Sequence, residues 1–128
     1  MPNKLYTFLS RSSSGEPYQV EVAVFDSEKI SMHCSCKAGL LKQWCKHKAD
    51  IIDGFGLLLI DESQLGIFEE VCGLIENSQL SNEYLQYKSE LEIIEETKIR
   101  LLNEIESEAK AAKKEAKLKF ARQLAEGI

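Results

Sequence analysis

Apolar and polar side chains alternate along the first 36 residues in a way that favours β-strands. The clearest stretch is residues 18–24, where the even-numbered positions are apolar or aromatic and the odd-numbered ones include Gln19 and Glu21. Successive side chains of a strand point to opposite faces, so one face of this segment is expected in the core. Turn-forming residues separate it from similar stretches at residues 4–11 and 30–36. The pattern predicts a three-stranded antiparallel meander.

Beyond the strands, apolar positions recur at helical spacing. A helix is expected over residues 46–60, although Gly54 and Gly56 each weaken it by about 1 kcal/mol relative to alanine. A second helix is expected next, because Asp61 and Gln64 have the spacing of a capping pair. The apolar face of this second helix comprises Leu65, Phe68, Val71, Cys72 and Ile75.

A third helical segment is much longer. Residues 82–126 contain neither proline nor glycine and are rich in strong helix formers, with Ser81 as the expected N-cap. A helix of ~45 residues extends roughly 65 Å, which a domain of this size cannot enclose. Its apolar positions alternate three- and four-residue steps, as in a coiled coil, with one polar position at Lys98. This seam comprises Tyr84, Tyr87, Leu91, Ile94, Leu101 and Ile105, and it thins to Ala109, Ala112, Ala116 and Phe120.

These elements predict an α+β fold: a small β-meander with a following helix, then a helical C-terminal half. The chain has 128 residues, of which 44% are hydrophobic and 29% charged, as in an ordinary soluble globular protein. Because a typical domain has about 100–150 residues, a chain of this length has no room for a second full enzyme domain. We therefore expect a head over residues 1–60, a connecting helix over residues 61–80 and a long C-terminal helix over residues 81–128.

No stretch approaches the roughly 18–20 consecutive apolar residues of a membrane-spanning helix. The first six residues also lack the apolar segment and small-residue cleavage site of a signal peptide. We therefore expect no membrane association, and a location in the cytoplasm or, in a eukaryote, the nucleus. Because thiols are reduced there, the four cysteines are expected to be metal ligands or buried thiols rather than disulfides.

The net charge of −5 is unevenly distributed. Residues 1–60 carry seven basic and six acidic side chains, residues 61–106 carry three and twelve, and residues 107–128 carry six and three. The head is therefore nearly neutral, the middle acidic and the C-terminal end basic. Each part is able to meet a different partner.

Three cysteines and a histidine within fourteen residues are the main candidate for chemistry: Cys34, Cys36, Cys45 and His47. Zinc prefers four such ligands in a tetrahedron, and two closely spaced pairs separated by a loop supply them. In a strand Cys34 and Cys36 point to the same side, so both sulfurs can reach one ion. With all four positions filled by protein, no open position remains for a catalytic water. We therefore expect one structural Zn²⁺ and no catalytic residue.

The order Cys-x-Cys, a short loop and Cys-x-His, with strands before it and a helix after it, resembles the SWIM zinc finger. The resemblance covers about residues 20–60, and its matching residues are Cys34, Cys36, Cys45 and His47. Members of this family occur beside helicase-like remodellers, Mutator-type transposases and recombination mediators. The resemblance implies binding of DNA or protein rather than catalysis.

Other interpretations of these residue types remain open. The cluster can also be a set of buried thiols with a surface histidine. His33 is the one substitute ligand nearby, but its side chain is expected on the strand face opposite that of Cys34. Cys72 is expected to fill the core, since no spacing brings it the base that a nucleophilic cysteine needs.

Two groups of lysines are candidates for contact with nucleic-acid phosphates. One surrounds the cysteines, where Trp44 can stack on a base, pack over the metal site or anchor a protein contact. The other follows helical spacing near the C-terminus. The groups are Lys37, Lys42, Lys46 and Lys48, and Lys110, Lys113, Lys114 and Lys117. The acidic residues between them oppose a duplex laid along the helix.

The sequence therefore predicts a non-enzymatic zinc-binding adaptor that binds DNA, RNA or a protein through its head. Its long helix is expected to bind a partner protein or a second copy as a homodimer. The alternative is a pure protein–protein module, such as a subunit or inhibitor of a nucleic-acid enzyme, whose head contacts no nucleic acid. No small-molecule substrate is expected, because no carboxylate pair, phosphate loop or open metal site is present.

Overall fold

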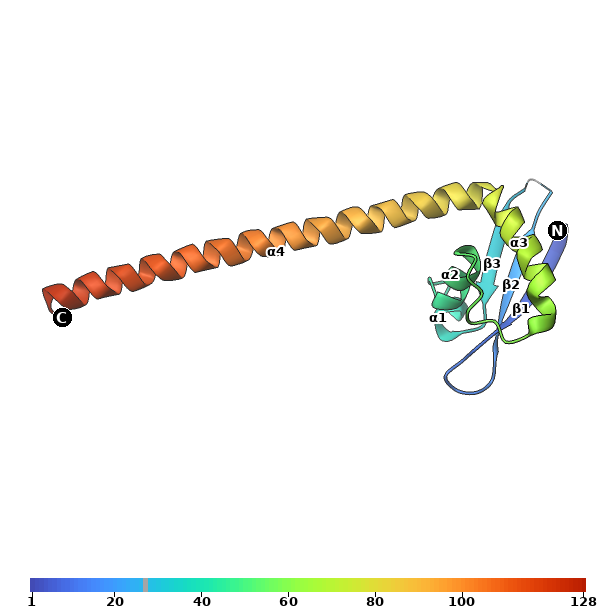
Figure 1. Cartoon of the computed structure of the whole chain (residues 1–128), viewed down its shortest axis with the longest axis horizontal. Coiled ribbons are helices and arrows are strands. Elements are labelled where there is room, and N and C mark those ends of the chain that lie inside the picture. The colour runs from blue at the N-terminus through green and yellow to red at the C-terminus, as the bar shows by residue number, and fades with distance from the viewer. Residues whose placement is uncertain (27) are drawn as a thin grey trace. The chain divides into compact units, whose positions relative to one another are not determined.

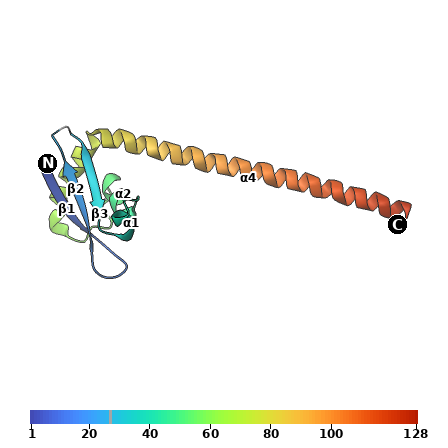
Figure 2. The same cartoon turned by 180° about the vertical axis from the view of Figure 1, so that it is seen from behind.

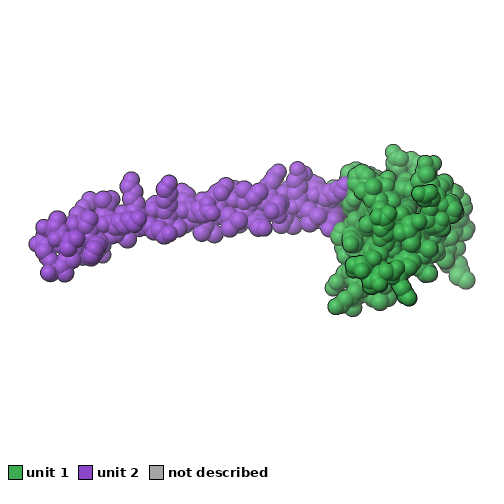
Figure 3. Space-filling view, turned by 60° about the horizontal axis from the view of Figure 1, so that its bottom comes forward, with its two compact units in different colours: residues 1–85 green, residues 86–128 purple. Residues whose placement is uncertain are grey.

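The computed structural model describes residues 1–26 and 28–128. This part of the chain forms two compact units, Met1–Leu85 and Gln86–Ile128 (Figure 3). The first unit contains a sheet and several helices, and the second consists of most of one long helix. None of the helices in the described part combines the length and the apolar character needed to cross a membrane.

An antiparallel sheet of three strands in the order β1-β2-β3 begins the first unit, as the alternation of side chains predicted. The register places Phe8 opposite Val20 and Val20 opposite Cys34, so these side chains share one face. On the central strand, the even-numbered Val20 and Val22 are fully buried. The strands are β1 (Lys4–Ser10), β2 (Tyr18–Val24) and β3 (Ile30–Cys34).

The helices follow the sheet in the sequence, which confirms the α+β fold class. In Figure 1, α3 lies across one face of the sheet, and Figure 2 shows the strands from the opposite side. The short helix α1, in the loop between the two ligand pairs, was not predicted. The elements are α1 (Lys37–Leu40), α2 (Lys46–Ile52), a 3₁₀ turn η1 (Glu62–Gln64), α3 (Leu65–Glu76) and α4 (Gln79–Glu126).

The core of the first unit lies between the sheet and its helices. The ring of Phe68 in α3 meets Phe8 of β1 edge-on, with ring centroids 6.1 Å apart. Ile51 and Val71 are fully buried in the same cluster. Each such side chain contributes about 1.5–3 kcal/mol through burial. The cluster also includes Cys34, Cys36 and Cys45. The candidate metal ligands are therefore continuous with the core.

The helix predicted over residues 46–60 is wrong in its second half, because α2 ends at Ile52. Gly54 and Gly56 adopt left-handed φ values of 78° and 61°, which a right-handed helix excludes. The carboxylate of Asp50 also accepts hydrogen bonds from two backbone N–H groups of the following segment. Those donors are thereby satisfied in a loop instead of in a further helical turn.

The second predicted helix is confirmed as α3. Asp61, the expected N-cap of this helix, instead caps the 3₁₀ turn η1 before it, where it accepts a hydrogen bond from the backbone N–H of Ser63 at 3.0 Å. Gln64, the expected partner in a capping box, instead donates to the carbonyl of Thr7 in β1 at 2.6 Å. Leu65 is the one exposed member of the predicted apolar face.

The long helix α4 has 48 residues and no buried side chain. Its predicted start after Ser81 is wrong, because the helix begins at Gln79 and contains Ser81. Leu80 packs against the core cluster, which ties down the first turn and gives a tertiary reason for the earlier start. A helix of this length extends about 70 Å.

Candidate metal centre

The four predicted metal ligands come from neighbouring elements of the first unit. Cys34 ends β3, and Cys36 precedes α1 as its N-cap. Cys45 precedes α2 as its N-cap, and His47 lies in the first turn of that helix. All four side chains are buried. The helix α1 and the turn after it thus bring the second ligand pair back to the first.

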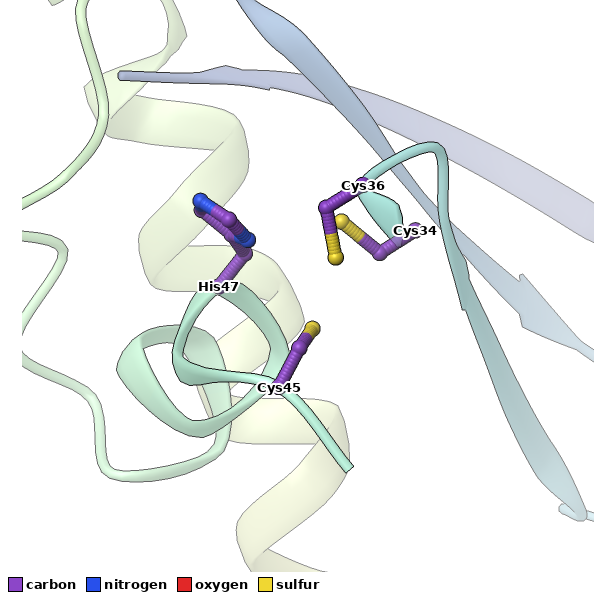
Figure 4. Close-up of side chains that lie close together, drawn as sticks. All are labelled: Cys34, Cys36, Cys45 and His47. Carbon is purple, nitrogen blue, oxygen red and sulfur yellow. The ribbon is translucent and has the colours of Figure 1, made fainter. Parts of the chain in front are cut away.

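The donor atoms of these residues form one compact group. The three sulfurs and a ring nitrogen of His47 all lie within 4.8 Å of one another. Figure 4 shows them facing a common space. A tetrahedral zinc site with bonds of about 2.0–2.3 Å has ligand atoms roughly 3.5–3.8 Å apart. The group therefore has the composition and size to hold one metal ion.

The ring of His47 is oriented as a metal ligand requires. Its Nε2–H donates to the backbone carbonyl of Arg11 at 3.2 Å, and Tyr18 packs edge-on against the ring with centroids 5.0 Å apart. Its Nδ1 is buried and has no hydrogen-bond partner among the described residues. A carbonyl that holds the far N–H of a histidine leaves the other nitrogen unprotonated for a metal. A bound ion therefore satisfies an atom that is otherwise buried without a partner.

The pKa shifts of the four residues favour a neutral imidazole at His47, and they differ in direction between the thiols of Cys34 and Cys36. Burial lowers the pKa of His47, although the Arg11 carbonyl opposes this shift. Burial raises the pKa of Cys34 to about 12. Burial also acts to raise the pKa of Cys36, but hydrogen bonds from the Gly39 N–H and the neighbouring thiols outweigh it, so this pKa is lowered. Because metals bind thiolates, loading the site must release protons, including the one on Cys34.

The backbone at Gly39 closely approaches that of Cys34, next to the first ligand pair. The N–H of Gly39 donates to the sulfur of Cys36 at 3.2 Å, which turns α1 back over the strand end. A Cβ at Gly39 would lie 2.1 Å from the carbonyl oxygen of Cys34. Only glycine fits this position without a backbone shift.

The carbonyl that holds His47 is positioned by the loop after α2. The carboxylate of Asp50 accepts hydrogen bonds from the backbone N–H groups of Leu57 and Leu58, each at 2.9 Å. The carbonyl of Leu58 accepts from the N–H of Arg11 at 2.8 Å. The buried Asp50 therefore acts on the histidine ring indirectly, through the backbone that follows β1.

The first group of predicted contact lysines lies on the segment that carries the four candidate ligands. Lys37 begins α1, Lys42 follows it and Lys46 begins α2, and all three are exposed. Lys48 is half-buried, and its ammonium group donates to the carbonyl of Gln43 at 3.3 Å. The structure thus presents three of the four side chains to solvent on the loop that carries the ligands.

Trp44 lies on the same loop and is 46% exposed. Its ring contacts that of Tyr84, with centroids 5.9 Å apart. The Tyr84 hydroxyl donates to Asp53 at 2.8 Å. Tyr84, the first residue of the predicted seam, is therefore engaged by the loop that carries the candidate ligands and by the segment after α2, within the first unit.

The rest of the predicted seam lies along α4 with exposed side chains. Exposed fractions run from 36% to 63% for Tyr87, Leu91, Ile94, Leu101 and Ile105. The second group of predicted lysines also lies on this helix, and all four are exposed: Lys110, Lys113, Lys114 and Lys117.

His33 and Cys72 do not belong to the metal group. His33 is exposed on β3 opposite Glu21, as its place in the alternation predicted. The sulfur of Cys72 lies 4.0 Å from the carbonyl of Ile51, and burial raises its pKa. A thiol of raised pKa that packs against the core is a poor nucleophile at neutral pH.

Three parts of the centre were missed by sequence reasoning: Gly39, the Arg11 carbonyl and Asp50. The glycine three residues after Cys36 was an available signal, because glycine permits a close approach of two backbone segments. The other two depend on pairing between distant segments, which no local pattern specifies.

Comparison of the chain with models of protein families, with curated proteins and with solved structures found no match.

Proposed function

We propose that the chain is a non-enzymatic adaptor whose first unit is a SWIM-type head built around structural Zn²⁺. The buried, unpartnered Nδ1 of His47, facing three cysteine sulfurs, carries this proposal. Three thiolates and one imidazole in a compact group suit tetrahedral zinc better than the harder ions that prefer oxygen. Because four protein ligands complete the tetrahedron, the ion's role in this proposal is to hold the fold rather than to activate water.

The head binds nucleic acid through the loop around the metal in this proposal. The sequence from Ile30 to Ala49 contains no aspartate or glutamate, although the first unit as a whole is acidic. Exposed Lys37, Lys42 and Lys46 supply positive charge for phosphates, and Trp44 supplies a partly exposed ring for stacking on a base. In the same proposal α4 assembles the adaptor with a protein.

A second candidate is a head that binds only protein. It is favoured by Leu40 and Leu41, which are 74% and 61% exposed on the same loop as Trp44. Neighbouring exposed apolar side chains are typical of protein-binding surfaces. In the first candidate the exposed lysines of this loop bind phosphates, whereas in the second they contact no nucleic acid.

The experiment that tests the proposal is titration of the zinc-loaded protein with single-stranded and duplex DNA and RNA across a range of salt concentrations. Binding should weaken with salt, and Lys37→Gln/Lys42→Gln should reduce the magnitude of the log–log slope by about 2, since each lost phosphate contact removes about 1. Lys29→Gln, an exposed lysine outside the metal loop, is the matched control and should change little. Absence of binding at low salt contradicts the nucleic-acid proposal and leaves the protein-binding candidate.

A further inference from the structure

The exposed apolar seam of α4 is graded in size along the second unit. Large side chains such as Leu91 and Ile94 occupy its first half, and alanines such as Ala112 and Ala116 occupy its second half. The steps from Leu91 onward average about 3.6 residues, so the seam follows one side of a nearly straight helix. None of these side chains is buried.

This grading makes the seam complementary to itself only when the helix direction is reversed. Two parallel copies bring leucine against leucine in one half and alanine against alanine in the other. Helices pack at a separation set by the side chains between them, so a straight pair cannot satisfy both halves. Antiparallel copies instead place Leu91 opposite Ala116 and Ile94 opposite Ala112. Large and small side chains then meet on both sides of the centre, where Leu101 lies opposite Ile105, and Tyr87 lies opposite Phe120 at the two ends.

The polar position of the seam favours the same direction. Lys98 interrupts the apolar side chains, and its ammonium group lies 3.8 Å from Glu95 on the same helix. In a parallel pair the two Lys98 side chains face each other, which brings like charges together in an apolar contact. In the antiparallel pair Lys98 faces Ala109, whose small side chain leaves room for the ammonium to reach solvent.

The charges beside the seam are also divided along its length. Residues 90–108 contain seven acidic and two basic side chains, whereas residues 109–122 contain six basic and one acidic. Reversal brings Lys113 of one copy beside Glu95 of the other, because both residues flank the seam on the same side. A parallel pair brings acidic segments together and basic segments together.

We propose that α4 binds a second copy of this chain in antiparallel orientation, centred near Asn103. This inference rests on the proposed function, in which α4 assembles the adaptor with a protein, and it identifies that protein. Seam volume, the place of Lys98 and the division of charge each point independently to this arrangement.

The first test is sedimentation of the full-length, zinc-loaded protein at micromolar concentrations, without nucleic acid. A dimer is expected. Lys113→Glu and Glu95→Lys should each weaken the dimer by about tenfold, because each change removes both symmetry-related pairs and introduces repulsion. The chain with both substitutions should recover the original dissociation constant within about threefold, because opposite charges face again. A monomeric wild-type chain, or a double variant weaker than either single variant, overturns the proposal.

The second test is zero-length cross-linking with a carbodiimide, followed by mass spectrometry of the linked peptides. Lys113 and Glu95 lie 18 residues apart on one helix, a separation of about 27 Å. A direct amide between them can therefore form only between two chains. The expected product is a Lys113–Glu95 link. A dimer whose links join only equivalent segments is parallel and overturns the proposal. Both tests are independent of the lysines of the metal loop, so either proposal can fail alone.

Discussion

The two units of the chain maintain their structure by different means. In the first unit, contacts join distant segments: Phe8 meets Phe68, and the Arg11 carbonyl holds His47. In the second unit, α4 is a continuous helix with no buried side chain. Substitutions in the first unit are therefore expected to act through packing and metal binding. Those in the second are expected to act through helix propensity and association.

Removal of a candidate metal ligand should produce the largest difference between the two units in their response to a substitution. Cys36→Ser removes one of the four proposed zinc ligands, and structural zinc sites typically contribute about 10–16 kcal/mol of apparent binding free energy. The first unit should lose its metal and unfold, while α4 keeps most of its helical circular dichroism. Zinc content and thermal unfolding measure the loss.

The matched control for this change is Cys72→Ser, since Cys72 is partly buried and lies outside the metal group. It should keep close to one zinc per chain. Retention of metal and fold by Cys36→Ser would falsify the structural-site interpretation.

A single methyl group at Gly39 should have the next largest effect. The added Cβ overlaps the Cys34 carbonyl, so Gly39→Ala should destabilise the first unit by about 3 kcal/mol and weaken metal binding. Gly73→Ala in α3 meets open space and is expected to stabilise its helix by about 1 kcal/mol. Chemical denaturation of the two variants measures the contrast, and equal stabilities would show that the close approach at Gly39 does not constrain the fold.

Removal of the Asp50 carboxylate should have an intermediate effect. Asp50→Ala leaves two backbone N–H groups without their acceptor and loosens the loop that positions Arg11. The expected cost is about 2–3 kcal/mol, together with weaker metal binding. Asp26→Ala, on the surface, should cost less than about 0.5 kcal/mol. If metal affinity is unchanged in Asp50→Ala, the proposed path to His47 through the backbone is wrong.

The smallest expected effect concerns the start of α4. Tyr84→Phe removes the hydrogen bond to Asp53 but keeps the ring beside Trp44, so it should cost about 1 kcal/mol. Trp44 is the only tryptophan, and its fluorescence reports on this contact directly. Tyr84→Ala should shift the emission further. An emission spectrum identical to that of the wild type in both variants contradicts the observed packing.

Much of the fold and the members of the buried Cys/His cluster could be predicted because their signals are local. Alternation in residues 18–24 identified a strand, and the spacing of the cysteines with His47 identified the cluster that could hold a metal ion. The prediction of a helix over the whole of residues 46–60 was wrong, because apolar residues continue at helical spacing past Ile52, where α2 ends. There the left-handed glycines and the Asp50 carboxylate, rather than periodicity, decide the conformation.

Features that depend on distant contacts could not be predicted. Gln64 has the spacing of a capping residue, yet Thr7 offers its carbonyl from β1 and takes the hydrogen bond. Tyr84 has the spacing of a seam residue, yet Trp44 and Asp53 engage it. In both cases a local pattern was overridden by a tertiary partner that the sequence alone does not locate.

The compact spacing of the ligands also has a consequence for the order of folding. The segment from Cys34 to His47 spans only fourteen residues, whereas the aromatic contact between Phe8 and Phe68 joins residues sixty positions apart. Closing a short loop costs less chain entropy, so metal capture is expected before the core assembles. In the proposed zinc-bound protein the metal therefore serves as a folding nucleus, and the rate of refolding is expected to rise with the concentration of free zinc.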